Sequence, residues 1–294
     1  MEKKSSFAGR YMDGLTTRLV TAMVFVGVML GGIFGGLIPY AILFTLLLGL
    51  CLWEYLGLVL GEDHRLFPLR SLAGMLMGLL PHVVLIAHRA HWLVLTDQQI
   101  YLLLILYLLG LFSLFVLELF SRSREPFRNL AFVLMGIVYI GLPFSLLNFL
   151  SIHTGTYDHT YVLGIVLLTW TNDTAAYMIG SRFGRRKLFP RISPKKTWEG
   201  SNGGALLTLI VGWALHAIFP QFPLFGWLGL SLIVIVFGSI GDLVESMLKR
   251  SIEVKDSGSL LPGHGGLLDR FDSFIFCLPF AVAYVLLLQG GIHF

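Results

Sequence analysis

The chain has 294 residues, of which 56% are apolar and only 13% are charged, and its formal net charge is +4. Soluble globular domains carry about 25% charged residues, so this composition excludes an ordinary soluble protein. Apolar runs of about 20 residues, the length that crosses a bilayer, recur along the whole chain. The composition therefore predicts an all-α fold, a polytopic membrane helix bundle.

Hydropathy and the polar residues between the apolar runs predict about nine transmembrane helices. Their expected positions are 19–38, 40–60, 69–88, 99–119, 128–150, 160–180, 203–219, 224–248 and 271–289. Only Pro39 separates the first two, and the first is interpreted as a retained helix because no short apolar region with a cleavage site is present. We divide the chain into an N-terminal membrane region of about five helices, 1–150, and a C-terminal region of about four, 151–294, with polar loops at 181–202 and 249–270.

The basic residues predict the orientation of these helices. With the N-terminus in the cytoplasm, all of the 21 Lys and Arg residues except Arg89 lie on the cytoplasmic side, as the positive-inside rule requires. Nine spans then place the C-terminus outside. The sequence pI of about 9.1 is explained by these loops and needs no nucleic-acid partner.

Two polar segments precede the last third of the chain. Asn172 and Asp173 lie late in the sixth apolar run, where an ionisable side chain is costly and is paired or functional; they form either a polar clamp between helices or the wall of a polar cavity. Lys195, Lys196 and Thr197 follow in a loop whose lysines, hydroxyl and backbone amides suit phosphate oxygens. That loop is equally compatible with a solvated cytoplasmic loop, and it lacks the order of a Walker P-loop.

Acidic and basic residues recur with helical spacing at the end of the eighth run. Asp242, Glu245, Ser246 and Lys249 follow an i, i+3, i+4, i+7 pattern that puts them on one helix face. Such a stripe is a poor surface for lipid, so we expect it to face a cavity. The acidic residue Glu54, inside the second apolar run, is expected at the membrane interface.

The loop after this stripe adds further charge. Asp269 and Asp272 repeat the i, i+3 spacing at the start of the ninth helix, and Asp256 lies between the two groups. Carboxylates in this number suit a hard cation, above all Mg²⁺, which takes a few carboxylates together with substrate phosphates. An ion-paired loop without a ligand is the structural alternative.

The same block resembles the signature of the phosphatidate cytidylyltransferases, also called CDP-diacylglycerol synthases. The matching positions are Ser246, Lys249-Arg250, Lys255-Asp256, Gly258, Pro262, His264-Gly265-Gly266, Asp269-Arg270 and Asp272. The segment from Asn172 to Gly200 is also similar to this family. The resemblance implies a Mg²⁺-dependent transfer of the cytidylyl group of CTP to phosphatidate in the membrane, with release of pyrophosphate, in phospholipid biosynthesis.

The resemblance also implies roles for individual residues. The expected catalytic residues are Asp242, Asp269, Lys249, Arg250, Asp256, His264, Arg270 and Asp272. The expected substrate-binding residues are Lys195, Lys196, Thr197, Ser246, Lys255, Asn172 and Asp173. For the metal, Asp242 and Asp269 are the first choice, followed by Glu245 and Asp272.

Two other functions remain open at this stage. A CTP-dependent kinase of a polyprenol or phytol type would share the nucleotide and metal chemistry, and a membrane transporter would place acids along a path through the bilayer. We expect a multi-pass protein of a bacterial inner membrane with its active site at the cytoplasmic face. The oligomeric state is left open, a homodimer included.

Overall fold

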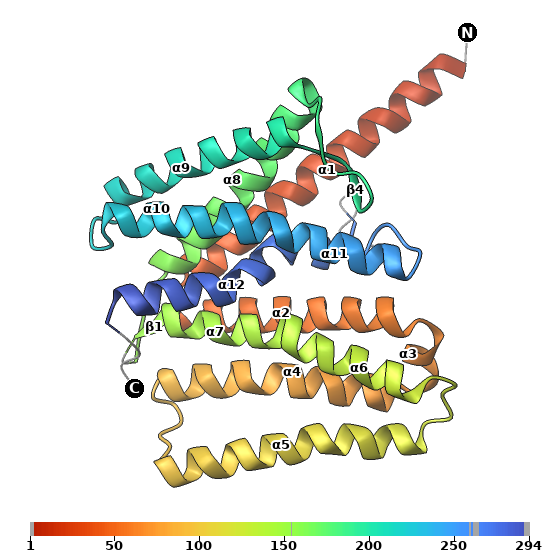
Figure 1. Cartoon of the computed structure of the whole chain (residues 1–294), viewed down its shortest axis with the longest axis vertical. Coiled ribbons are helices and arrows are strands. Elements are labelled where there is room, and N and C mark those ends of the chain that lie inside the picture. Colours follow the sequence, from red (N-terminus) through yellow and green to blue (C-terminus); the bar gives the residue numbers. More distant parts are fainter. Residues whose placement is uncertain (1–2, 154, 259, 261–264, 291–294) are drawn as a thin grey trace.

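The computed structural model describes residues 3–153, 155–258, 260 and 265–290 as a bundle of long helices that run back and forth (Figure 1). In the first half, the helices are α1 (Lys3–Phe34), α2 (Leu37–Leu60), the short α3 (Glu62–Leu66), α4 (Pro68–Arg89), α5 (Asp97–Phe120), α6 (Pro126–Gly136) and α7 (Leu142–Ser151). In the second half they are α8 (Thr160–Phe183), α9 (Trp198–Ile218), α10 (Leu224–Ile233), α11 (Ser239–Ser251) and α12 (Leu268–Leu288).

Two of the long helices contain a π-helical segment. The segment η1 (Ile137–Gly141) joins α6 to α7, and η2 (Val234–Gly238) joins α10 to α11. Such segments are rare in proteins, and those that occur often lie near functional sites. The second of them directly precedes the helix that carries the predicted acidic stripe.

Eight helical stretches in the described chain are long and apolar enough to cross a membrane. They are Leu37–Leu60, Pro68–Arg89, Asp97–Phe120, Pro126–Ser151, Thr160–Phe183, Trp198–Ile218, Leu224–Ser251 and Leu268–Leu288. The protein is thus a membrane helix bundle, as predicted. The apolar part of α1, Leu19–Phe34, is shorter, and the count of nine spans stays a prediction.

Several predicted boundaries need correction. Pro39 does not separate the first two helices: the break falls at Gly36, whose φ is +97°, and Pro39 lies in the first turn of α2, where a missing N–H costs nothing. The seventh span begins at Trp198 rather than at residue 203. Part of the predicted loop 181–202 is an antiparallel hairpin of β3 (Lys187–Phe189) and β4 (Ser193–Thr197).

The arrangement places the start of α1 and the end of α12 at opposite ends of the bundle (Figure 1). The end that holds the start of α1 also holds α3, the hairpin β3–β4, the end of α11 and the start of α12. A second small hairpin, β1 (Ile152–His153) with β2 (Thr156–Tyr157), lies at the other end. The predicted polar segments therefore meet at one end.

Glycines bring α8 and α9 unusually close together. A Cβ on Gly200 would lie 2.6 Å from the carbonyl oxygen of Ala176 and 2.9 Å from the Cα of Gly180. On Gly204, one turn further along α9, it would lie 2.9 Å from the carbonyl oxygen of Asn172. This close packing fixes the hairpin that precedes α9 beside the end of α8.

Aromatic and aliphatic side chains of α2, α7 and α12 form the core of the bundle. Phe44, Phe144 and Phe274 are buried and lie with ring centroids 6.1 to 6.4 Å apart. Phe271, one turn before Phe274, joins the same group. The start of α12 is thereby held against the N-terminal half of the chain.

Candidate functional site

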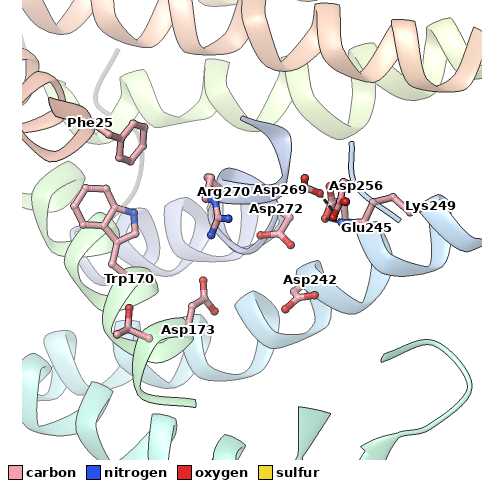
Figure 2. Close-up of a pocket in the computed structure, with 11 residues that line it drawn as sticks. Phe25, Trp170, Asp173, Asp242, Glu245, Lys249, Asp256, Asp269, Arg270 and Asp272 are labelled. Atoms are coloured by element: carbon pink, nitrogen blue, oxygen red, sulfur yellow. Dashed lines mark hydrogen bonds and ion pairs between the residues drawn. The ribbon is translucent and has the colours of Figure 1, made fainter. Parts of the chain in front are cut away.

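A cavity of about 380 Å³ lies where α8, α11 and α12 meet (Figure 2). Most of its lining is charged, although the surrounding helices are apolar. The described lining residues are Phe25, Trp170, Asp173, Thr174, Asp242, Glu245, Lys249, Asp256, Asp269, Arg270 and Asp272. Figure 2 shows Phe25 and Trp170 together at one edge of the cavity and Lys249 at the other. Six carboxylates and two basic side chains thus converge on one space.

The predicted stripe on α11 is present. Ser246 Oγ donates to Asp242 Oδ1 at 3.2 Å, and Lys249 Nζ donates to Glu245 Oε2 at 2.7 Å. Both pairs are four residues apart, which places them one turn apart on the same face. Glu245 is only 1% exposed, whereas the Asp242 side chain is 34% exposed. Asp242 is therefore the acid of this stripe that a ligand reaches most directly.

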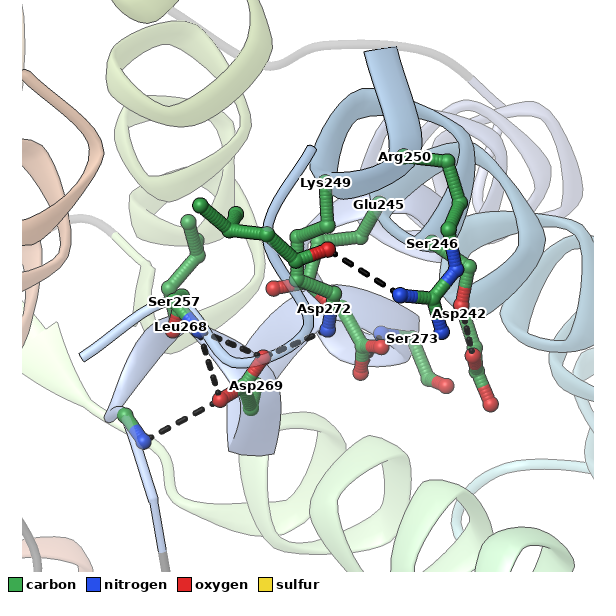
Figure 3. Close-up of polar contacts among 12 residues, drawn as sticks. Asp242, Glu245, Ser246, Lys249, Arg250, Ser257, Leu268, Asp269, Asp272 and Ser273 are labelled. Atoms are coloured by element: carbon green, nitrogen blue, oxygen red, sulfur yellow. Dashed lines mark hydrogen bonds and ion pairs between the residues drawn. The ribbon is translucent and has the colours of Figure 1, made fainter. Parts of the chain in front are cut away.

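Asp269, at the start of α12, organises the loop that precedes it (Figure 3). Its Oδ1 accepts from Lys249 Nζ at 2.6 Å, and its Oδ2 accepts from the amides of Ser257 and Gly266, each at 3.1 Å. The side chain is largely buried, with 14% exposed. Asp269 thus ties α11, the loop and α12 together.

The end of α8 contributes a second set of polar contacts. Asp173 Oδ1 accepts from Ser273 Oγ at 3.3 Å, which links α8 to α12. Asn172 is buried and makes a long contact of 3.5 Å with Ser239 Oγ at the start of α11. Of the two predicted roles, Asn172 fits the clamp between helices, and Asp173 lines the cavity.

The hairpin β3–β4 reaches the cavity through one lysine. Lys196 Nζ lies 2.8 Å from Asp242 Oδ2 and donates to the carbonyl oxygen of Ser239 at 3.2 Å. Thr197 is buried and caps α9, since its Oγ1 accepts from the amide of Gly200. The neighbouring Glu199 accepts from the backbone amides of Arg185 and Arg186. Thr197 and Glu199 hold the hairpin in place, and Lys196 pairs with Asp242.

Other predicted residues lie around this centre. Asp256 and Arg270 are exposed and line the cavity. Lys195, Arg250 and Lys255 are exposed as well, and the described lining does not include them; Arg250 donates to the carbonyl oxygen of Val254 at 3.0 Å. His264, together with Pro262 of the signature, lies outside the described residues.

Sequence reasoning did not find three residues near the site. Phe25 and Trp170 line the cavity, with ring centroids 5.8 Å apart; each lies in a long apolar run, where one aromatic residue gives no signal. Glu54, for which we expected no role beyond a place at the membrane interface, is 7% exposed and accepts from the amide of Leu268 at 2.7 Å. The sequence signal that could have indicated a role for Glu54 was its acidic side chain inside an apolar run.

The donor atoms of the cavity fit a hard cation together with phosphates. Carboxylate oxygens outnumber the basic groups, and Glu245 Oε1 is buried without a hydrogen-bond partner among the described residues. In the same part of the chain, no three His, Cys, Asp or Glu side chains lie close enough to hold a metal ion by themselves. Mg²⁺ is commonly bound by one or two carboxylates plus substrate phosphates, and the Lys and Arg groups suit phosphate oxygens.

Comparison with known proteins gives the family. The sequence model of the Cytidylyltransferase family matches residues 16–288, a range that includes every described residue of the cavity. The chain belongs to the cytidylyltransferase family. The resemblance seen in the signature block is thereby confirmed.

Curated relatives include phosphatidate cytidylyltransferases of several bacteria. The protein of Staphylococcus aureus (strain COL) is 45% identical over 172 residues, which are 58% of this chain and 64% of that protein. The protein of Bacillus subtilis (strain 168) is 40% identical over 178 residues, 58% of this chain and 65% of that protein. The chain thus covers slightly less than two thirds of the length of these relatives.

Proposed function

We propose that this member of the cytidylyltransferase family transfers the cytidylyl group of CTP to phosphatidate and releases pyrophosphate, which supplies CDP-diacylglycerol for phospholipid biosynthesis. The observation that carries the proposal is the cavity of six carboxylates with Lys249 and Arg270, at one end of a membrane helix bundle. Its bacterial relatives carry the name of this activity. We place the protein in a bacterial inner membrane, with this end of the bundle in the cytoplasm.

The reaction joins a lipid anion to a nucleotide anion. A phosphate oxygen of phosphatidate attacks the α-phosphorus of CTP and forms a new P–O bond. The bond from that phosphorus to the bridging oxygen of the β-phosphate breaks, and both electrons leave with pyrophosphate. Because the attacking oxygen is already an anion near neutral pH, the site needs no general base. Its tasks are to align two polyanions and to stabilise the charge on the leaving group.

Basic residues of the cavity suit the phosphate groups. Lys196 of the hairpin pairs with Asp242 of the lining, and Arg270 of α12 lines the cavity itself, so the two would approach a bound phosphate from different elements. Three further basic residues are exposed and are close in sequence to these two: Lys195, Arg250 and Lys255. We propose that they attract the nucleotide before it binds in the cavity. Phosphate binding by Arg and Lys uses charge-assisted hydrogen bonds, which are stronger than neutral ones.

We also propose that the cavity uses Mg²⁺. Asp242, Glu245 and Asp272 line the cavity, and Glu245 Oε1 has no hydrogen-bond partner among the described residues; substrate phosphates would complete the set of ligands. When bound there, Mg²⁺ would neutralise phosphate charge and favour departure of pyrophosphate. Asp269 was predicted as a ligand too, but its oxygens already accept from Lys249 and two backbone amides. We therefore assign Asp269 to holding the loop.

An assay with two labels separates the proposed reaction from a lipid kinase. Purified protein in detergent is given phosphatidate and Mg²⁺ with CTP labelled on either the α- or the γ-phosphorus, and a matched set receives EDTA. We expect the α-label in the lipid and the γ-label in pyrophosphate, both lost with EDTA. The Asp242→Asn variant controls for a contaminating enzyme. In a parallel reaction with a polyprenol in place of phosphatidate, transfer of the γ-label to the lipid would instead show a kinase. No α-label in the lipid with phosphatidate would contradict the proposed function, and no labelled lipid in either reaction would contradict both.

A further inference from the structure

Glu54 of α2 contacts the start of α12, more than two hundred residues away in the chain. Its Oε2 accepts a hydrogen bond of 2.7 Å from the backbone amide of Leu268, and Leu268 is the first residue of α12. The amides in the first turn of a helix have no partner within the helix. A carboxylate is favoured there because it also meets the positive end of the helix dipole. Glu54 thus caps the helix that carries Asp269, Arg270 and Asp272.

The loop before α12 is packed against the same carboxylate. A Cβ on Gly258 would overlap Glu54 Oε1, and a Cβ on Gly266 would lie 2.8 Å from both carboxylate oxygens. At Gly266 the nearest atom would be Ser257 Oγ, with the Glu54 oxygens next, so Gly258 is the position at which Glu54 alone sets the limit. Neither glycine has a positive φ, so the constraint comes from these contacts and not from backbone conformation.

Two acids therefore contact this loop. Asp269 accepts from the amides of Ser257 and Gly266, and Glu54 lies against Gly258 and Gly266 while it binds the amide of Leu268. Asp269 belongs to the cavity, whereas the described lining of the cavity does not include Glu54. Glu54 consequently acts on the cavity through the backbone of the loop.

Burying the Glu54 carboxylate in α2 costs free energy, so packing alone does not explain why an acid occupies this position. Glu54 is 7% exposed and lies in a helix apolar enough to cross a membrane, and a carboxylate at membrane depth is expensive unless it is paired or functional. Its neighbours on the same helix are apolar or aromatic, as in the sequence Leu52-Trp53-Glu54-Tyr55. Among the described residues, the Glu54 carboxylate lies against the loop and the start of α12.

We propose that Glu54 is a positioning residue, which fixes the loop and the first turn of α12 so that Asp269, Arg270 and Asp272 face the cavity. This inference rests on the proposed function, since it names what Glu54 does for that reaction. It assigns α2, which contributes no described residue to the lining, a part in the site.

The first test compares two substitutions at one position. Glu54→Ala removes the acceptor, and we expect kcat to fall by about 10- to 100-fold, the usual effect of removing a group that orients ligands of a site, with KM for CTP changed much less. Glu54→Gln keeps an oxygen acceptor of the same reach and should retain most of the activity. Tyr55→Phe is the matched control, because it removes a hydrogen bond of the same helix to Phe132 and should leave kcat unchanged. Equal kcat in wild type and Glu54→Ala would overturn the proposal.

The second test uses the tight contact with Gly258. Gly258→Ala alone should lower kcat, because its Cβ displaces the Glu54 carboxylate. In the double variant Gly258→Ala/Glu54→Ala the overlap is gone, so the two losses should be far from additive. Additive losses would mean that the two positions act independently, which contradicts the proposal.

A third measurement does not depend on activity. Hydrogen–deuterium exchange of the peptide that covers 265–272 should be faster in Glu54→Ala than in wild type and near wild type in Glu54→Gln. Unchanged exchange in Glu54→Ala would show that Glu54 does not fix this segment. If the wild-type protein itself transferred no cytidylyl group, the proposed function would fail, and the exchange data would still decide whether Glu54 holds the loop.

Discussion

Lys196 Nζ lies 2.8 Å from Asp242 Oδ2. The pair joins the hairpin before α9 to the acidic face of α11, across the end of α8. Both side chains are partly exposed, at 23% and 34%, and exposed ion pairs contribute little to stability. The pair places a positive charge beside an acid of the cavity, and we propose that Lys196 exchanges Asp242 for a substrate phosphate.

This pair separates the roles of two adjacent lysines. We expect Lys196→Ala to lower kcat/KM for CTP by about 10- to 100-fold, because losing a charge-assisted contact to a phosphate costs roughly 1.5–3 kcal/mol. Lys195→Ala should have a smaller effect on the same constant, since Lys195 is exposed. Steady-state kinetics of the two purified variants measure both. A larger loss in Lys195→Ala would mean that Lys195, and not Lys196, makes the main contact with the phosphate.

Asp242 and Asp269 are expected to respond differently to the same substitution. Asp242→Asn should reduce turnover by about 100-fold or more and raise the Mg²⁺ concentration needed for half-maximal rate, because a neutral amide is a poor ligand for this ion. Asp269→Asn should also reduce turnover, but with an unchanged Mg²⁺ requirement and a lower melting temperature, since Asp269 binds two loop amides and Lys249.

The measurement is a Mg²⁺ titration of each variant, together with a thermal unfolding curve in detergent. Asp97→Asn is the matched control, because Asp97 is an exposed acid in the first turn of α5, and it should behave as wild type in both assays. A shifted Mg²⁺ requirement in Asp269→Asn would restore Asp269 to the set of metal ligands.

Much of the site follows from helical spacing. Asp242, Glu245, Ser246 and Lys249 share one face because their spacing matches the helical turn, and the bonds of Ser246 to Asp242 and of Lys249 to Glu245 confirm it. The membrane bundle likewise follows from the length and hydropathy of the apolar runs. Periodicity and hydropathy are local properties, so a single sequence reveals them.

Contacts between distant segments could not be read in this way. The hairpin β3–β4 was expected as an irregular loop, because its strands are short and carry few β-branched residues. Glu54 was assigned to the membrane interface, since nothing near it in the sequence shows that the amide of Leu268 meets it. The partner of a buried acid such as Glu54 depends on how α2 packs against α12. A single sequence carries no signal for that packing.

Lys249 is also important for stability. It is 12% exposed and lies between Glu245 at 2.7 Å and Asp269 at 2.6 Å. Removing one partner of a buried ion pair costs about 3–5 kcal/mol, because the remaining charge is left without compensation. We therefore expect Lys249→Met to lower the melting temperature strongly, and the double variant Lys249→Met/Glu245→Gln to recover part of the loss. Thermal unfolding in detergent measures both, and a double variant less stable than Lys249→Met would refute this account.

Asp63, in the short helix α3, should make stability depend on pH. Hydrogen bonds of 2.6 Å from Ser123 Oγ and Asn129 Nδ2 reach its Oδ2, and they hold the pKa of this carboxyl below its usual value. A lowered pKa in the folded protein means that the ionised form is stabilised by folding. This contribution is complete above the unfolded pKa of about 3.9 and is lost as the pH falls through the folded pKa.

Asp63→Asn tests this dependence. The variant should melt below wild type near neutral pH, and the difference should shrink as the pH falls from about 5 toward 3. Melting curves of both proteins over this range give the difference directly. A difference that grows in acid would have the wrong sign for a carboxyl with a lowered pKa.

The orientation of the bundle gives the last prediction. The two ends of α5 lie at opposite ends of the bundle (Figure 1), and basic residues gather after it, at Arg122 and Arg124 in the connection and at Arg128 in the first turn of α6. By the positive-inside rule this connection is cytoplasmic and Asp97 is outside. A cysteine in place of Asp97 should therefore react with a membrane-impermeant maleimide in intact spheroplasts, and one in place of Arg124 only after permeabilisation.

Both positions are exposed, so accessibility within the protein does not confound the comparison, and the native Cys51 and Cys277 are buried. A tag at the C-terminus should be reachable from the same side as Asp97, because an odd number of spans separates it from a cytoplasmic N-terminus. Labelling of Arg124→Cys in intact spheroplasts would invert the bundle and put the acidic cavity on the wrong side for CTP. Labelling of Asp97→Cys with a C-terminal tag that is cytoplasmic would keep the orientation of α5 and change the number of spans after it.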